Sequence, residues 1–171
     1  MMRILRSLLP LLASCALATA CSSGGDASTL CHDTFQPYVD LTVGQARTAQ
    51  NGTFLDAMEL YRSGNYNGSV DSLKAYLQRR DARVSARLYL ACAYIALDRP
   101  YDAELELDKL EQSTTREFKD QCDWYTTVCW ACSGQYPRAL QGAREIMGSG
   151  RHTYARNAAD LIEALRSIGV E

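Results

Sequence analysis

Several features common in enzymes and nucleic-acid-binding proteins are missing from this chain. It has two histidines in 171 residues, and neither lies in a recognisable catalytic motif. A glycine-rich phosphate loop of either standard pattern is absent. The 18 Lys and Arg residues are interspersed with 20 Asp and Glu residues, without the basic clusters that nucleic-acid binding requires. We therefore expect no enzyme, no cofactor, no nucleic-acid partner and no small-molecule substrate.

An apolar run long enough to cross a bilayer is also missing. The apolar stretch near the start covers only residues 8–17, and Arg3 and Arg6 precede it. This arrangement is typical of a signal peptide over residues 1–20. The chain would therefore be exported.

Two kinds of processing fit the end of this leader. A small residue directly before Cys21, followed by a small polar stretch, indicates a bacterial lipoprotein site, and Cys15 offers an earlier site of the same kind. Residues 18–20, Ala-Thr-Ala, also fit ordinary signal-peptidase cleavage. We favour lipidation of Cys21, which would anchor the mature chain to the cell envelope because more than one acyl chain inserts. A soluble periplasmic or secreted protein is the alternative.

Aromatic residues recur along the chain at one spacing. Two series advance by 35 residues at each step: Phe54, Tyr89 and Trp124, and Tyr66, Tyr101 and Tyr136. A fixed period of this length indicates stacked supersecondary units that bury their apolar faces against one another. The sequence therefore predicts three copies of one unit.

Each copy has the pattern of two helices joined by a short turn. In the first copy, apolar residues at helical spacing end at Gly64, and the second and third copies carry Pro100 and Pro137 where a partner helix would begin. A last helix over residues 154–168 keeps one polar face, as a terminal repeat requires. We predict an all-α domain of about three helical hairpins with a C-terminal capping helix over residues 51–171, preceded by a tether and an irregular segment over residues 21–50.

These copies resemble tetratricopeptide repeats, a family of helix hairpins of about 34 residues. The residues that carry the resemblance are Leu90-Ala91 with Tyr94, Ala57 and Ser69, Gly64-Asn65-Tyr66, Ala103, Gly134-Gln135-Tyr136 and Ala139. The family's proline at the repeat end is missing. The register of the second helix in the middle copy is left open by one residue. Ala103 follows Tyr101 by two residues, whereas Ala139 follows Tyr136 by three. With its leader, the chain looks like small repeat lipoproteins of Bacteroidetes-type bacteria.

The resemblance implies a function in protein–protein interaction. In the family, a groove lined by the first helices of the hairpins holds a protein or peptide, which places Glu59, Tyr94 and Tyr125 as partner-binding candidates. We therefore expect a membrane-tethered scaffold. An envelope assembly or chaperone-type lipoprotein, which would recognise outer-membrane clients through its convex face or the segment at residues 30–50, is the alternative.

The cysteines leave a third, less favoured interpretation open. Five remain after Cys21, namely Cys31, Cys92, Cys122, Cys129 and Cys132, and an odd number leaves at least one thiol free. Cys129 and Cys132 form a C-x-x-C pair that could exchange disulfides, but they lie near the predicted end of a helix, where the helix dipole disfavours a thiolate. A zinc site from Cys122, this pair and His152 would have an unfamiliar spacing, so we expect no metal.

Overall fold

The described part of the protein is entirely helical. The structure is a computed structural model that describes residues 27, 29–113 and 116–171. Eight helices occur in these residues: α1 (Leu30–Thr34), α2 (Gly52–Arg62), α3 (Tyr66–Leu77), α4 (Ser85–Ala96), α5 (Pro100–Glu111), α6 (Lys119–Cys132), α7 (Tyr136–Gly148) and α8 (Ala155–Ser167). Because the same residues contain no strand, the predicted all-α class is confirmed.

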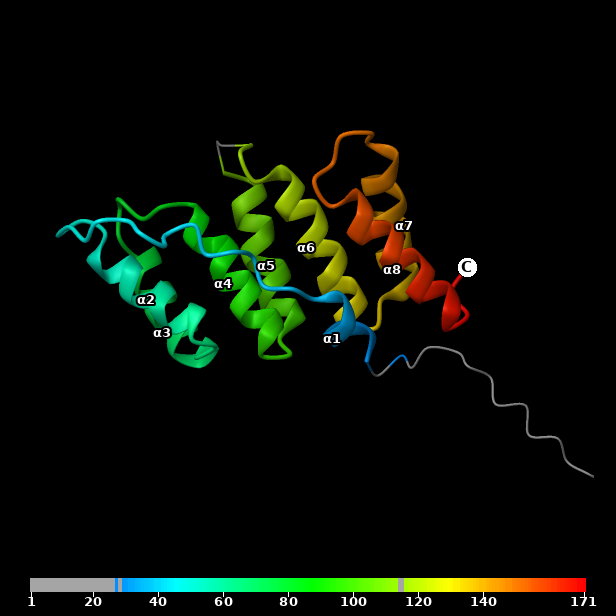
Figure 1. Cartoon of the computed structure of the whole chain (residues 1–171), viewed down its shortest axis with the longest axis horizontal. Helices are drawn as coiled ribbons and strands as arrows, with labels where there is room; N and C mark the ends of the chain where they lie inside the picture. Colours follow the sequence, from blue (N-terminus) through cyan, green and yellow to red (C-terminus); the bar gives the residue numbers. More distant parts are fainter. Residues whose placement is uncertain (1–26, 28, 114–115) are drawn as a thin grey trace, which may run out of the picture.

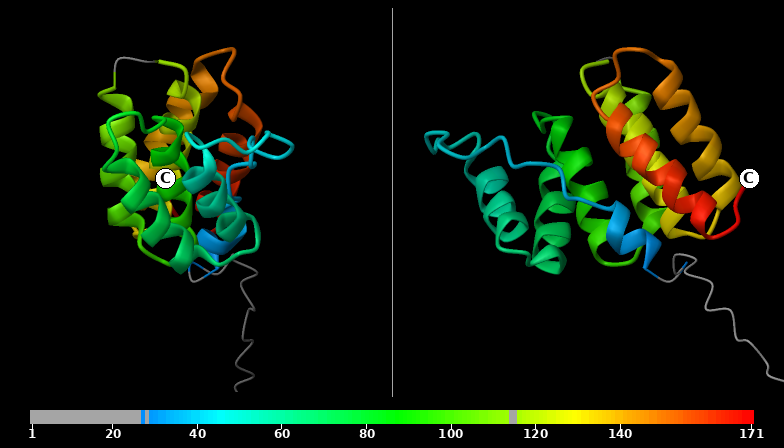
Figure 2. Two further views of the ribbon diagram at one scale, coloured as in Figure 1. Left: turned by 90° about the vertical axis from the view of Figure 1, so that its left-hand side faces the viewer. Right: turned by 45° about the vertical axis from the view of Figure 1, so that its right-hand side comes forward.

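The helices pack in chain order as a row of hairpins (Figure 1). Helices α2 and α3, α4 and α5, and α6 and α7 form three antiparallel pairs, and α8 packs on α7. The apolar side chains between neighbouring layers join into one core that extends from Phe54 to Leu165. The first helices of the pairs, α2, α4 and α6, lie on one side of the row (Figure 2).

The turns inside the three hairpins share one backbone geometry. Gly64, Asp98 and Gly134 have φ values of 76°, 57° and 74°, and the next helix begins two residues later in each case. Glycine adopts this left-handed conformation without cost, whereas an aspartate does so with some strain that its short polar side chain tolerates. Equivalent turns are therefore 34 residues apart and then 36 residues apart, with 35 only as the mean.

The structure corrects the register of the middle copy. Pro100 begins α5 as Tyr66 begins α3 and Tyr136 begins α7, so Tyr101 is not equivalent to those tyrosines and is 66% exposed. Counted back from the turn residues Gly64, Asp98 and Gly134, Leu88 rather than Tyr89 corresponds to Phe54 and Trp124. The physical reason is that α6 has 14 residues whereas α4 has 12, so the second interval is longer and a constant spacing cannot hold. Small residues follow three positions after each of these helix starts and are fully buried: Ser69, Ala103 and Ala139.

The aromatic residues of the first helices nevertheless lie between layers, as expected. Phe54 stacks on Tyr76 with ring centroids 5.0 Å apart and also contacts Tyr89 at 6.1 Å. Trp124 stacks on Tyr154, which immediately precedes α8, at 5.6 Å. The first contact joins the two helices of one hairpin, whereas the other two join neighbouring units of the row. Such ring pairs stabilise the packing beyond their buried area.

Helices α6 and α7 approach closely at Gly142. A Cβ atom at this position would lie 2.6 Å from Oγ1 of Thr127 and 2.9 Å from the ring of Trp130. Only glycine fits there without movement of those side chains, because real Cβ atoms do not approach other atoms so closely. This close approach places Trp130 and Thr127 at the edge of the cleft described below.

The segment expected to be irregular, residues 21–50, has more order than predicted. Within its described part, the five-residue helix α1 packs on α6 and α8, and Leu30 is buried. Residues 35–43, which we call the strap, then run across α6, α4 and α2 (Figures 1 and 2). Side chains alternate along it: Tyr38, Asp40 and Thr42 face the helices, whereas Val39, Leu41 and Val43 are exposed.

Candidate functional site

Three tyrosine hydroxyls on the first helices bind the main chain of the strap. Tyr125 of α6 donates to the carbonyl oxygen of Gln36 at 3.0 Å, and Tyr61 of α2 donates to that of Tyr38 at 3.0 Å. Tyr89 of α4 donates to the carbonyl of Val39 at 3.3 Å and accepts from the amide of Leu41 at 3.1 Å. We call Tyr61, Tyr89 and Tyr125 the tyrosine face.

This face recognises an extended backbone. All four bonds use peptide groups, which every residue type supplies, so they do not depend on the sequence of the bound segment. The aromatic rings add apolar area, because Tyr38 of the strap packs with ring centroids 5.8 Å from Tyr89 and 6.5 Å from Tyr125. Phe35 adds an edge contact with Tyr125 at 6.4 Å.

An ion pair fixes the strap at its other end. Arg62 of α2 donates to a carboxylate oxygen of Asp40 at 2.7 Å, and the Asp40 side chain is only 7% exposed. The second carboxylate oxygen accepts from the amide and hydroxyl of Thr42 at 2.7 and 2.6 Å. A carboxylate so enclosed requires these partners, because a buried unpaired charge is strongly unfavourable.

A disulfide closes the opposite end of the strap. Cys31 of α1 is bonded to Cys132, the last residue of α6, across 101 residues of sequence. Both cysteines are half-buried. The strap is therefore held covalently at the end near α6 and by the continuing chain at the end near α2.

Burial of the tyrosine face shifts its acid–base behaviour. Burial raises the pKa of Tyr89 to about 12, and it raises the pKa of Tyr61 and Tyr125 further. The thiol of Cys92, which is buried beside Tyr61 and Tyr125, has its pKa raised to about 12 for the same reason. These groups remain protonated near neutral pH, so the hydroxyls act as hydrogen-bond donors and not as bases.

This burial predicts a loss of stability in alkali. The unfolded-state pKa of a tyrosine is about 10, so the stabilisation from neutral Tyr89 is complete below about pH 10 and is lost as pH rises through about 12. In full it amounts to about 3 kcal/mol. Urea unfolding at pH 8 and pH 11, followed by circular dichroism, measures it, and Tyr89→Phe should reduce the decline. An unchanged urea midpoint at pH 11 would contradict the prediction.

The three predicted partner-binding residues lie in different places. Tyr125 belongs to the tyrosine face but is 2% exposed beneath the strap. Tyr94 is buried on another side of α4, where the guanidinium of Arg99 lies 4.6 Å from its ring, so it does not line the same surface. Glu59 is exposed and pairs with Arg62. The residues that sequence reasoning missed are Tyr61 and Tyr89, whose hydroxyl role has no local signal.

The less favoured interpretation of Cys129 and Cys132 as a disulfide-exchanging pair does not fit the structure. Cys132 is bonded to Cys31, whereas Cys129 is a buried thiol whose pKa is raised by burial. A thiol of this kind is a poor nucleophile, because only the thiolate attacks. The zinc alternative also loses Cys132 as a ligand, and no metal-binding group of histidine, cysteine and carboxylate side chains occurs in the described ranges. The predicted lipidation site, Cys21, and its alternative, Cys15, lie outside the described residues.

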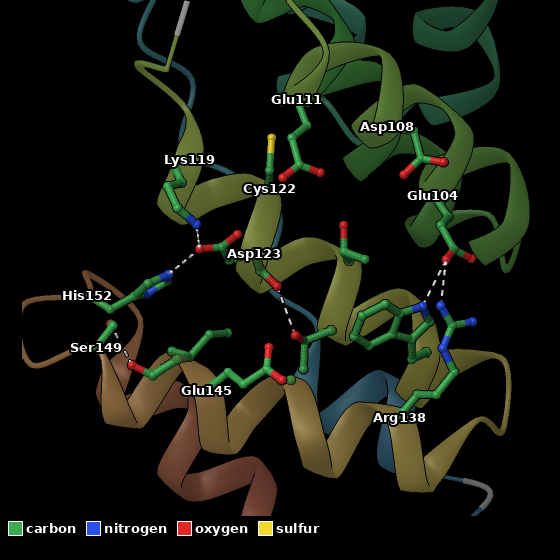
Figure 3. A pocket seen from close by; sticks show the side chains of 15 residues that line it. Glu104, Asp108, Glu111, Lys119, Cys122, Asp123, Arg138, Glu145, Ser149 and His152 are labelled. Atoms are coloured by element: carbon green, nitrogen blue, oxygen red, sulfur yellow. Dashed lines mark hydrogen bonds and ion pairs between the residues drawn. The ribbon is translucent and has the colours of Figure 1, made fainter.

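A second feature is an acidic cleft between α5, α6 and α7, with a volume of about 490 Å³ (Figure 3). Its carboxylates outnumber its two cations, Lys119 and Arg138: Glu104, Asp108, Glu111, Asp123 and Glu145. Glu104 accepts from Nε1 of Trp130 at 2.8 Å and lies 3.7 Å from Arg138, whose guanidinium covers the Trp130 ring at 4.4 Å. The face of the Trp130 ring, where a cationic ligand could stack, is thus covered by Arg138 of the chain itself.

The other end of the cleft is organised around Asp123. Lys119 donates to it at 2.5 Å, and Nε2 of His152 lies 3.4 Å from it. Nδ1 of His152 accepts from the amide of Tyr154 at 3.2 Å, so a neutral imidazole carries its proton on Nε2, toward Asp123. Cys122 also lines the cleft, and burial raises its pKa to about 12. Glu104 and Asp123 are therefore paired with basic side chains of the cleft, and the thiol of Cys122 stays protonated near neutral pH.

Among the described helices, none combines the length and apolar character that crossing a bilayer requires. Neither a family model, nor a curated protein, nor a solved structure matches the chain.

Proposed function

We propose that this chain is a tetratricopeptide-like scaffold that binds an extended segment of a protein partner on its tyrosine face. It would be tethered to a bacterial cell envelope by lipid on Cys21, as the leader pattern predicts. Supporting the repeat assignment are the shared turn geometry at Gly64, Asp98 and Gly134 and the fully buried small residues that follow each turn.

The observation that carries this proposal is the set of main-chain hydrogen bonds from three tyrosines to the strap. A surface that holds residues 35–41 through their peptide groups has the chemistry to hold another extended segment in the same way. The inferred ligand is therefore an extended polypeptide, with an aromatic side chain in the place of Tyr38 and a carboxylate near Arg62. A helical ligand fits less well, because its peptide groups are already bonded within the helix.

Binding of a synthetic peptide tests the proposal. The probe is a fluorescein-labelled peptide with the sequence of residues 33–43. The protein carries Tyr38→Ala and Asp40→Ala, which weaken its own strap, and Cys31→Ser, which removes the bond that holds one end of the strap. We expect saturable binding by fluorescence anisotropy. Tyr125→Phe in this background should weaken binding about twofold to tenfold, because it removes one hydrogen bond to the peptide.

The matched control is Tyr101→Phe, which removes a hydroxyl that is exposed on α5. It should leave the dissociation constant unchanged. Absence of saturable binding to the strap-weakened chain would count against the proposal, as would equal effects of Tyr125→Phe and Tyr101→Phe.

One observation favours the assembly or chaperone alternative. The outer side of the strap exposes Val39, Leu41 and Val43 at 63%, 58% and 66%. Three neighbouring exposed apolar side chains suit contact with an apolar client surface. An envelope partner whose crosslinking depends on Val39 and Leu41, but not on Tyr125, would support this alternative over the scaffold.

A further inference from the structure

The strap occupies the surface that an external segment would use. Its carbonyl oxygens accept hydrogen bonds from the three tyrosine hydroxyls, and the Tyr38 ring packs against Tyr89 and Tyr125. A competing segment must displace it, and an intramolecular ligand has an effective concentration in the millimolar range. With both of its ends held, the strap cannot leave the face.

The two ends of the strap are held differently. At the end near α2, the chain continues through a turn in which Asn51 bonds Thr48 and Ala46 before α2 begins. At the end near α6, the covalent link is the bond between Cys31 and Cys132. Only the second link can be opened and closed by exchange chemistry under physiological conditions.

We propose that thiol–disulfide exchange at Cys31–Cys132 opens the tyrosine face to an extended partner segment. This inference rests on the function proposed above and adds its regulation. In the oxidised protein the strap blocks the face, and in the reduced protein the strap is a one-ended, displaceable competitor.

The burial pattern of the cysteines supports this assignment. Both bonded cysteines are half-buried at the edge of the helix row, whereas the free cysteines of the described ranges, Cys92, Cys122 and Cys129, are buried. An external thiolate therefore reaches the disulfide from solvent, and the free thiols offer it no S–S bond to attack. Internal attack by Cys129, one helical turn from Cys132, is disfavoured because burial raises the pKa of Cys129 and keeps it protonated.

The reaction needs an external dithiol as reductant. One of its thiolates attacks a sulfur of the Cys31–Cys132 bond, forms a mixed disulfide and releases the other cysteine as a thiolate, which takes up a proton. The second thiol of the reductant then attacks the mixed disulfide and releases the remaining cysteine. The reductant is oxidised to its own disulfide by two electrons, and Cys31 and Cys132 both become thiols.

Release of the strap leaves the helix row with its own core. The core residues lie between successive helices, and the tyrosine hydroxyls become accessible to water or to a new backbone. The disulfide therefore acts as a latch on a surface element, while the hairpins stay packed.

Hydrogen–deuterium exchange and peptide binding on the full chain test this latch. Exchange is compared for residues 35–43 and for residues 88–95 of α4 in oxidised protein, in protein reduced with a phosphine, and in Cys31→Ser. Reduction should accelerate exchange of the strap at least about tenfold and leave α4 protected, and it should tighten binding of the labelled 33–43 peptide at least about tenfold. The phosphine should have no effect on Cys31→Ser.

Three outcomes would overturn the latch. The first is equal strap exchange in oxidised and reduced protein. The second is equal peptide affinity of both forms while the strap-weakened chain still binds, which refutes the latch and leaves the proposed function intact. The third is loss of protection in α4 together with the strap, which would make the disulfide a staple of the whole fold. Accelerated strap exchange without peptide binding to any form, including the strap-weakened chain, would instead refute the proposed function.

Discussion

Replacing both Cys31 and Cys132 by serine is expected to lower the free energy of unfolding by about 3 to 5 kcal/mol. The disulfide closes a loop across 101 residues, so in the chain-entropy account it removes much of the freedom of the unfolded state. Urea unfolding of the oxidised protein and of the double variant, monitored by far-ultraviolet circular dichroism, measures the difference.

The control for this prediction is the reductant itself. Reduced wild-type protein should match the double variant, and reductant should not change the variant further. Equal urea midpoints for the oxidised protein and the variant would show that Cys31–Cys132 does not constrain the unfolded chain. This global effect is separate from the latch, which concerns local release of the strap under conditions where the helices remain folded.

Trp124→Ala is expected to lower the free energy of unfolding by about 3 to 5 kcal/mol. The indole is 2% exposed and lies parallel to the ring of Tyr154, with an interplanar angle of 8°. Its removal leaves a large cavity and the loss of the stacked pair that joins α6 to the start of α8. The same unfolding experiment measures it.

The matched control is Leu105→Ala, on the exposed side of α5, where the leucine is 52% exposed. We expect a change within about 0.5 kcal/mol there, because little apolar area is removed from burial. A cost below about 1 kcal/mol for Trp124→Ala would mean that the aromatic series does not hold neighbouring layers together.

Helices and turns could be read from the sequence because their signals are local. Gly64 and Gly134 mark left-handed turns, and Pro100 marks the first turn of a helix. The register of the middle copy could not be read with certainty. Asp98 adopts the positive φ that glycine adopts in the other two turns, and no glycine marks this turn in the sequence. The constant 35-residue spacing was therefore an average of two different intervals.

The candidate site depended on information that no local pattern holds. In the corrected register Tyr89 and Tyr125 occupy equivalent positions, directly after Leu88 and Trp124. Tyr61 lies near the end of its helix at a different position, so the repeat did not group the three tyrosines. The strap does carry a local signal, the alternation of Tyr38, Asp40 and Thr42 with apolar neighbours, but it is too short to indicate what it packs against. Of the predicted binding residues, only Tyr125 lies on this surface, where its hydroxyl donates to the main chain of the strap.

By itself, the sequence determined an all-α chain of successive hairpins whose last helix keeps one polar face, because helix periodicity and turn chemistry act between residues close in the chain. Only the tertiary structure decided that the face of α2, α4 and α6 is covered by the strap and that Cys132 pairs with Cys31 rather than with Cys129. These contacts join residues tens of positions apart. Their geometry follows from how the helices stack, which fixes the distances between groups that the sequence leaves independent.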